Sequence, residues 1–173
     1  DVWERCWGGK TLMGKPVVRE SLFDPSRWQL AIGVGSPQIR RAIVGKMPPE
    51  TRYATLVHPS AVVSQWVGLG EGAIICAGCV LTCDIHIGEH AQLNLNTTVG
   101  HDCQIGDFFT TAPGVNVSGR CQIGDEVYIG SGAALREELR VCSQVLIGMG
   151  AVVVKDLVQP GTYVGNPARL LER

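Results

Sequence analysis

The stretch "VGHDCQIGDFFTTAPGVNVSGRCQIGDEVYIG", residues 99–130, places an aliphatic side chain at nearly every sixth position. The spacing extends in both directions: from Val57 to Val153, 17 positions lie six residues apart, and all but Thr111 are Val, Ile or Leu. A second position, four residues after each of these, holds no charged residue. A chain that is 45% hydrophobic would not produce this run by chance. A six-residue repeat therefore organises more than half of the chain.

Glycine follows the aliphatic position directly in seven of these hexads, where the missing Cβ eases a bend and allows close stacking. Each hexad therefore predicts a short strand and a bend. Three hexads form one triangular coil, whose strands stack in parallel on those of the next coil. The 97 residues from Val57 to Val153 predict a mainly β protein, a parallel β-helix of about five coils.

The chain has seven cysteines, including Cys6 near its start. Cys79, Cys103 and Cys121 occupy the second inward position, so we expect them to be core thiols without a chemical role. Cys76 and Cys79 form the one CxxC pair, which is typical of a redox or zinc site when a second pair is present. Since no second pair exists, two small residues of the repeat are the favoured interpretation.

The charge is nearly balanced, with 15 basic and 16 acidic residues, and the basic residues are scattered. This composition argues against nucleic-acid binding and against a basic membrane-binding surface. No apolar run approaches the roughly 18 residues of a membrane span, and the start "DVWERCWGGK" lacks the layout of a signal peptide. We therefore expect a cytoplasmic protein.

Before the repeat, the pattern changes to that of a small α/β segment. Residues 8–18 and 28–36 predict strands, residues 37–47 predict a helix, and residues 52–58 predict a further strand. Ser36 is placed to cap the helix, with proline in the first turn and two prolines after the end. The segment is too short for a complete nucleotide-binding domain.

Three parts follow from these patterns. Residues 1–56 are expected to form a partial α/β domain of the kind that binds sugar nucleotides, and residues 57–155 the β-helix. Residues 156–173 leave the six-residue period, and we expect this tail to pack along the prism.

The motifs "GKPVV", "AIGVGSPQIRR", "HPSAVV", "GHDCQIGDF", "APGVNVSG" and "VGNPAR" resemble one group of hexapeptide-repeat acyltransferases. The group comprises sialic-acid O-acetyltransferases and bacillosamine-pathway nucleotide-amino-sugar N-acetyltransferases. The resemblance implies a left-handed β-helix, a homotrimer with active sites between prisms, acetyl-coenzyme A bound by the β-helix, and a nucleotide-linked sugar held by the α/β domain. No glycine-rich turn like the family's opening "GASGHA" precedes Asp1, so we expect an incomplete sugar-side domain, consistent with a fragment.

His101 and Asp102 fall between two inward positions, Val99 and Cys103, so their side chains should point outward from a corner of the coil. Spacing alone leaves both a surface residue and a catalytic residue open. The resemblance implies that His101 is the general base, which deprotonates a hydroxyl or amine as it attacks the thioester. It also implies that Asp102 orients and stabilises the imidazole.

The resemblance further matches the family's acetyl-coenzyme A contacts to Thr110, Gly119, Ser131 and Met149. The family often has histidine where Thr110 stands, so this contact is expected to be weakened or replaced. Gly33 and Gly35 match the sugar-side loop, although an ordinary turn explains such a pair equally well.

The predicted function is acetyl-coenzyme A-dependent transfer of an acetyl or longer acyl group to a hydroxyl or amine of a sugar. The acceptor sugar and the acyl length stay open. One alternative is a non-catalytic β-helix that serves as a sugar-binding or oligomerisation scaffold. A zinc enzyme like carbonic anhydrase is another, but His86, His90 and His101 lack its ligand spacing, so no metal is expected.

Overall fold

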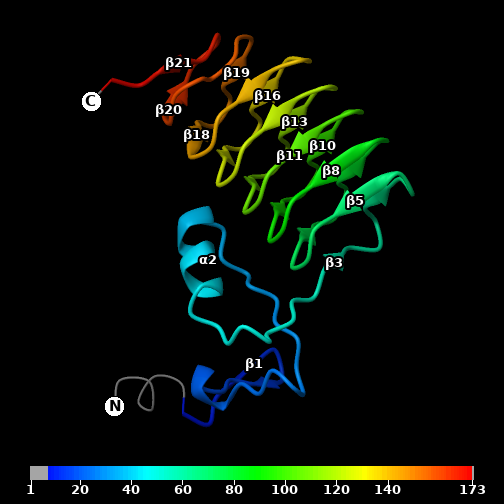
Figure 1. Ribbon diagram of the computed structural model, residues 1–173, viewed down its shortest axis with the longest axis vertical. Helices are drawn as coiled ribbons and strands as arrows, with labels where there is room; N and C mark the ends of the chain where they lie inside the picture. Colours follow the sequence, from blue (N-terminus) through cyan, green and yellow to red (C-terminus); the bar gives the residue numbers. More distant parts are fainter. Residues whose placement is uncertain (1–7, 173) are drawn as a thin grey trace.

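The computed structural model describes residues 8–172, and its main part is a left-handed parallel β-helix with three flat faces (Figure 1). The first face contains β3 (Leu56–Val57), β6 (Ile74–Ile75), β9 (Gln92–Leu93), β12 (Thr110–Thr111), β15 (Tyr128–Ile129) and β18 (Val145–Ile147). The second face contains β4 (Val62–Val63), β7 (Val80–Leu81), β10 (Thr98–Val99), β13 (Asn116–Val117), β16 (Ala134–Leu135) and β19 (Val152–Val153). The third face contains β5 (Val67–Leu69), β8 (Ile85–Ile87), β11 (Gln104–Ile105), β14 (Gln122–Ile123) and β17 (Arg140–Val141).

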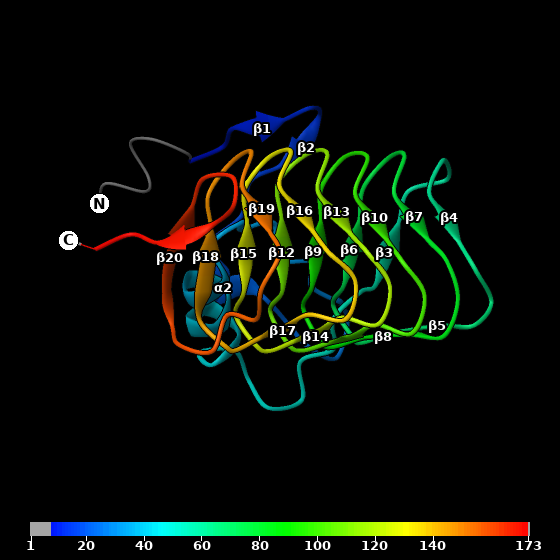
Figure 2. The ribbon, with the colours of Figure 1, turned by 90° about the horizontal axis from the view of Figure 1, so that it is seen from above.

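The register of every face follows the repeat. Thr98 pairs with Val80 on the preceding coil and with Asn116 on the following coil, a shift of 18 residues each way. The same shift holds from β3 to β19, so the strands of each face lie side by side (Figure 2). Strands β3 to β17 make the five predicted coils, and β18 and β19 begin another.

Both inward positions of the hexad form the core, as the repeat predicts. Ile75, Leu81 and Val115 are at most 1% exposed, and the two positions stay buried from Ala73 to Val153. In the first coil Val57 is 44% exposed, because no earlier coil covers it.

The core placement expected for the three inward cysteines is confirmed. Cys79, Cys103 and Cys121 are fully buried and form no disulfide, and burial raises the pKa of the Cys79 thiol. Cys76 is half-buried and also free, whereas Cys6 lies outside the described residues.

The bends share one backbone conformation. Every sixth residue from Gly72 to Gly150 has a positive φ, and nine of these fourteen residues are not glycine, among them Asp102 at 60°. This conformation is costly for most L-residues, and aspartate and asparagine tolerate it better than most. Three series of bends result, which we call the first corner (between the first and second faces), the second corner (between the second and third) and the third corner (between the third and first).

The segment before the β-helix follows its predictions only in part. The helix forms as α2, Pro37–Val44, three residues shorter than expected, and the Ser36 hydroxyl accepts from the backbone N–H of Ile39. The strand predicted over 8–18 is a hairpin of β1 (Thr11–Leu12) and β2 (Lys15–Pro16), followed by a 3-10 turn at Glu20–Leu22.

The strand predicted over 28–36 is wrong. Leu30 makes only an isolated bridge to Tyr53, and the strand predicted over 52–58 is limited to that bridge and β3. A strand needs partners to persist, and the described residues before β3 form no sheet other than the β1–β2 hairpin.

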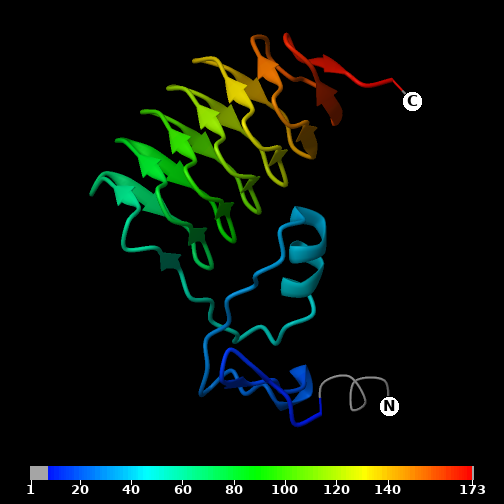
Figure 3. The same cartoon turned by 180° about the vertical axis from the view of Figure 1, so that it is seen from behind.

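The tail leaves the period as predicted, but it closes the end of the prism instead of lying along its side. Strand β20 (Gly161–Val164) pairs in parallel with β18, and β21 (Arg169–Leu170) then folds back antiparallel to β20 (Figure 3). The last rung of the first face is thereby covered. In residues 8–172, no helix has the length and apolar character to cross a membrane.

Candidate active site

His101 and Asp102 project outward from the second corner, as the repeat predicts. Nδ1 of His101 lies 2.6 Å from Oδ2 of Asp102, and both side chains are about half exposed, at 49% and 52%. The backbone beneath them is held from both sides: the Asp102 N–H donates to Cys83 on one coil, and the Arg120 N–H donates to His101 from the next. The imidazole is thus fixed at Nδ1 and accessible to solvent.

Gly119 occupies the same corner one coil later. A Cβ built on Gly119 would lie 2.8 Å from Nε2 of His101, so the imidazole rests against the bare backbone of this glycine. The structure therefore brings together three residues predicted from the sequence: the histidine, the aspartate and one proposed coenzyme contact.

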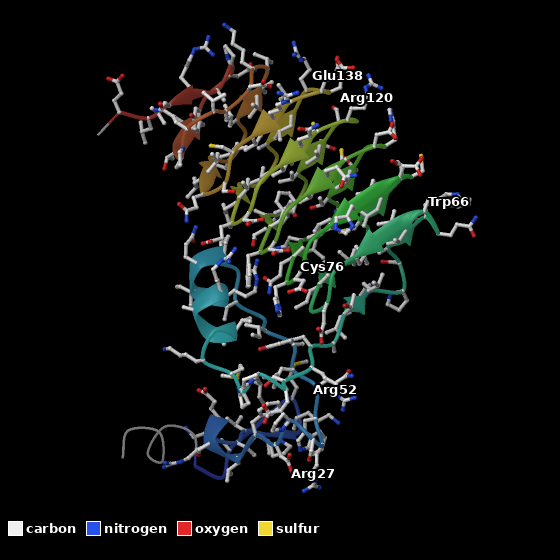
Figure 4. The ribbon with its side chains drawn as sticks, in the orientation of Figure 1. Arg27, Arg52, Trp66, Cys76, Arg120 and Glu138 are labelled. Atoms are coloured by element: carbon white, nitrogen blue, oxygen red, sulfur yellow. The ribbon has the colours of Figure 1, made fainter. Side chains whose placement is uncertain are left out.

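Two charged residues continue this corner beyond Asp102. Arg120 follows it by one coil and Glu138 by two, and Nε of Arg120 donates to Oε1 of Glu138 at 2.8 Å. Figure 4 shows both at the same edge of the β-helix. This pair is not predicted from the sequence, although steps of 18 residues from Asp102 lead to both.

Ser131 and Met149 lie elsewhere, at the first corner. They are neighbours on consecutive coils, since the Gly150 N–H donates to the Ser131 carbonyl, and Met149 is 82% exposed. Twelve residues separate Gly119 from Ser131, which is two-thirds of a coil, and so the two stand at different corners. Within one chain, the second face lies between the two corners. Ser131 and Met149 stand at one of its edges, and His101 and Gly119 stand at the other.

On its outer side, the second face is more apolar than the third face. Its outward side chains include Val62, which is 63% exposed, and Val80, which is 37% exposed. The complete outward row is Val62, Val80, Thr98, Asn116, Ala134 and Val152. The third face instead presents the exposed polar row His86, Gln104, Gln122 and Arg140.

Thr110 lies in a third place, on the first face beside the predicted sugar-side loop. It lines a cavity of about 250 Å³ together with Gly33, Gly35 and Tyr128. The amide of Gln92 crosses to this loop and donates to the Ile32 carbonyl at 2.5 Å. The structure therefore places the glycine pair with one proposed coenzyme contact, away from His101. Cys76 also lines this cavity and is labelled in Figure 4.

The Thr110 side chain is buried, and its hydroxyl accepts a hydrogen bond from Nη2 of Arg40 at 2.7 Å. Arg40 stands on α2, next to Arg41, and its role is not predicted from the sequence. Nothing in "PQIRRAIV" separates the arginine that is buried from the one that pairs with Glu126 at the surface of the prism.

The histidines are dispersed. His86 is exposed on the third face, and His90 is buried at the third corner, where its ring stacks on Phe108 at 5.1 Å. Burial, followed by the charge of Arg40, lowers the pKa of His90. Across the part of the chain that is described, His, Cys, Asp and Glu side chains form no group of three or more suited to a metal ion.

Solved structures give clear similarities. The acetyltransferase domain of PglB from Neisseria gonorrhoeae is 33% identical, with a TM-score of 0.89, over 93% of this chain and 82% of that one. It has also been solved with acetyl coenzyme A. PerB from Caulobacter crescentus, solved with CoA and GDP-perosamine, is 30% identical with a TM-score of 0.86, over 93% of this chain and 81% of that one. WeeI from Acinetobacter baumannii is 33% identical with a TM-score of 0.87, over 94% and 81%.

No family model matches the sequence, and no curated protein sequence does. The chain nevertheless covers four-fifths of these structures at 30% identity or more, and with them it shares the β-helix. It belongs to the hexapeptide-repeat sugar acetyltransferases, the family of left-handed β-helix enzymes that includes the PglB domain and perosamine N-acetyltransferase.

Proposed function

We propose that this chain transfers an acetyl group from acetyl-coenzyme A to the amine of a nucleotide-linked amino sugar, with His101 as the general base. The observation that carries the proposal is the His101–Asp102 pair, whose side chains are hydrogen-bonded at 2.6 Å. The imidazole is accessible to solvent and packs on the backbone of Gly119. The relatives favour an amine over a hydroxyl, since PerB was solved with GDP-perosamine and is a perosamine N-acetyltransferase.

The geometry suits a proton transfer at Nε2. When the Asp102 carboxylate accepts from Nδ1–H, the neutral imidazole carries its lone pair on Nε2, which is the atom that can take a proton. As the sugar amine attacks the thioester carbonyl carbon, Nε2 accepts the amine proton. The C–S bond then breaks, and the imidazolium can return the proton to the coenzyme thiolate. Asp102 stabilises the imidazolium in between.

We further propose that the chain acts as a homotrimer whose sites are shared between copies. The proposed site residues stand at the two edges of the apolar second face: His101 and Gly119 at one edge, Ser131 and Met149 at the other. A threefold arrangement with this face toward the axis buries it, and it sets the second corner of one copy against the first corner of the next. The coenzyme would then lie between two β-helices.

The acceptor is assigned to the first-face cavity beside Gly33 and Gly35. In such a trimer this cavity lies beside the first corner, which faces the second corner of the adjoining copy. An acceptor bound in the cavity would therefore lie near the proposed catalytic histidine of that copy. The amide of Gln92 and the buried hydroxyl of Thr110 supply polar contacts in an otherwise largely apolar cavity.

The test combines calorimetric titration with acetyl-coenzyme A and a coenzyme-release assay over nucleotide-linked amino sugars and free sialic acids. The proposal expects coenzyme binding in the micromolar range or tighter and release with at least one nucleotide-linked amine. Absence of binding at millimolar coenzyme would remove the transferase assignment. Release with sialic acids alone would replace the amine by a hydroxyl.

A further inference from the structure

Arg40 is a buried cation without an acidic partner. Its side chain is 1% exposed, and in residues 8–172 no carboxylate lies within ion-pair distance of it. Its guanidinium instead donates to the carbonyls of Val34, His90, Phe108 and Phe109 and to the Thr110 hydroxyl. Burial lowers its pKa to about 10, so it remains charged at neutral pH.

The bond from Arg40 fixes the role of the Thr110 hydroxyl. A guanidinium has donors and no acceptor, so the Thr110 oxygen must accept in this pair. The hydroxyl keeps one hydrogen to donate, and among the described residues no hydrogen bond uses it. The nearby Phe109 carbonyl already accepts from both Arg40 and the Gln92 N–H, which occupies its two lone pairs. The cavity that Thr110 lines is the space toward which that hydrogen can turn.

A hydroxyl that accepts from a cation is also a stronger donor, because hydrogen bonds in a chain polarise one another. A second contact comes from Gln92, the strand neighbour of Thr110: it donates to the Ile32 carbonyl at 2.5 Å, at the base of the loop that carries Gly33 and Gly35. The guanidinium reaches the same loop through the Val34 carbonyl. Arg40 therefore holds the loop through the Val34 carbonyl and orients the Thr110 hydroxyl.

We propose that Arg40 is a positioning residue that holds Thr110 as a hydrogen-bond donor to an oxygen atom of the ligand in the first-face cavity. This inference rests on the proposed function for the ligands concerned. The shared chemistry is an oxygen acceptor, which belongs either to an amide or thioester carbonyl of the coenzyme or to a hydroxyl or phosphate of the nucleotide-linked sugar.

The experiment compares Thr110→Val, which keeps the shape and removes the hydroxyl, with Thr110→Ser, which keeps the donor. Coenzyme A and GDP-perosamine are titrated separately into the complete chain. Thr110→Val should weaken one of them by about tenfold, the effect of one hydrogen bond, while Thr110→Ser stays within about twofold of the wild type. The ligand that loses affinity identifies the source of the oxygen.

Arg40→Lys separates positioning from simple structural support. Lysine keeps the charge, but its single nitrogen cannot bond the loop and Thr110 in the same geometry, so the same ligand should lose affinity to a similar degree. In the Thr110→Val background, Arg40→Lys should add nothing further. Equal losses in both backgrounds would overturn the proposal. If Arg40→Lys does not fold, the comparison of valine with serine decides.

Failure of the proposed function and failure of the inference about Arg40 give different results. A wild-type chain that binds neither ligand removes the proposed function and this inference with it. A wild-type chain that binds, with Thr110→Val unchanged for every ligand bound, overturns only the role of Thr110 and Arg40.

Discussion

The imidazole of His101 rests on the backbone of Gly119, and Nε2 occupies space within 2.8 Å of where a Cβ on Gly119 would stand. The two residues are one coil apart at the second corner, and the position of the proposed base depends on the absence of a side chain at the other. A substitution at Gly119 should therefore change catalysis, whereas a substitution that pushes two coils apart should change stability.

Gly119→Ala should impair catalysis with little effect on stability. The added Cβ meets the movable ring of His101, which can swing toward solvent. A displacement of about 1 Å can cost about 10²-fold in rate, so kcat should fall by about 10- to 100-fold while the melting temperature changes by at most about 2 °C. Steady-state kinetics and a thermal melt measure the two quantities.

Gly100→Ala is the matched control for that variant. Here the added Cβ would lie 2.6 Å from the Gly119 backbone nitrogen, which cannot move without separating two coils. The melting temperature should fall clearly, by several degrees. A Gly119→Ala enzyme with wild-type kcat would mean that the imidazole does not act from the position described.

The sequence predicts the β-helix well, because each hexad sends two side chains inward and the period alone places His101 and Asp102 at an outward corner. It fails for the strand over 28–36, since strand formation there depends on partners that spacing cannot reveal. The buried role of Arg40 depends on how α2 docks, and that contact is not encoded in the repeat. The resemblance matches Ser131 and Gly119 as contacts of one coenzyme, whereas the 12-residue step between them places Ser131 at another corner of the same chain.

The proposed trimer predicts that a new charge disrupts assembly on the second face but not on the third face. Ala134→Glu puts a carboxylate on the second face between Asn116 and Val152, where three copies would bring three charges together, and should yield monomers. Gln122→Glu, the control on the exposed polar third face, should leave the trimer intact. Light scattering reports the mass of each variant. An active monomeric Ala134→Glu enzyme would contradict the shared site.

Shared sites also predict complementation. His101→Ala and Met149→Glu alter opposite edges of the second face, so each homotrimer should be inactive, the second through an acidic side chain facing the anionic coenzyme. Trimers refolded from an equal mixture should regain activity, because about a quarter of the interfaces then combine two wild-type edges. If each copy carried a complete site, mixing would restore nothing.

Stability should fall with acid because of His90. Its folded pKa lies below the ordinary 6.5, through burial and then Arg40, with Glu71 and Asp107 opposing. Below about pH 6.5 the unfolded chain binds this proton more readily than the folded one, so the free energy of unfolding decreases as pH falls toward the folded pKa.

His90→Asn tests this effect, since asparagine accepts the positive φ of 56° and does not titrate. Its melting temperature should be lower at pH 7.5 but should decline less between pH 7 and 5 than in the wild type. His86→Gln, on the exposed third face, should keep the wild-type slope. An unchanged slope in His90→Asn would assign the acid sensitivity to another group.

The most direct measurement is kcat for His101→Ala, with the acetyl-coenzyme A affinity determined on the same sample. Loss of the base should lower kcat by about 10² to 10⁴-fold, while the coenzyme dissociation constant stays within about twofold. Asp102→Asn should cost less, because the imidazole remains but loses its charged partner. Wild-type turnover in His101→Ala would contradict the account, because the corner that carries His101 would then be only a bend in the coil.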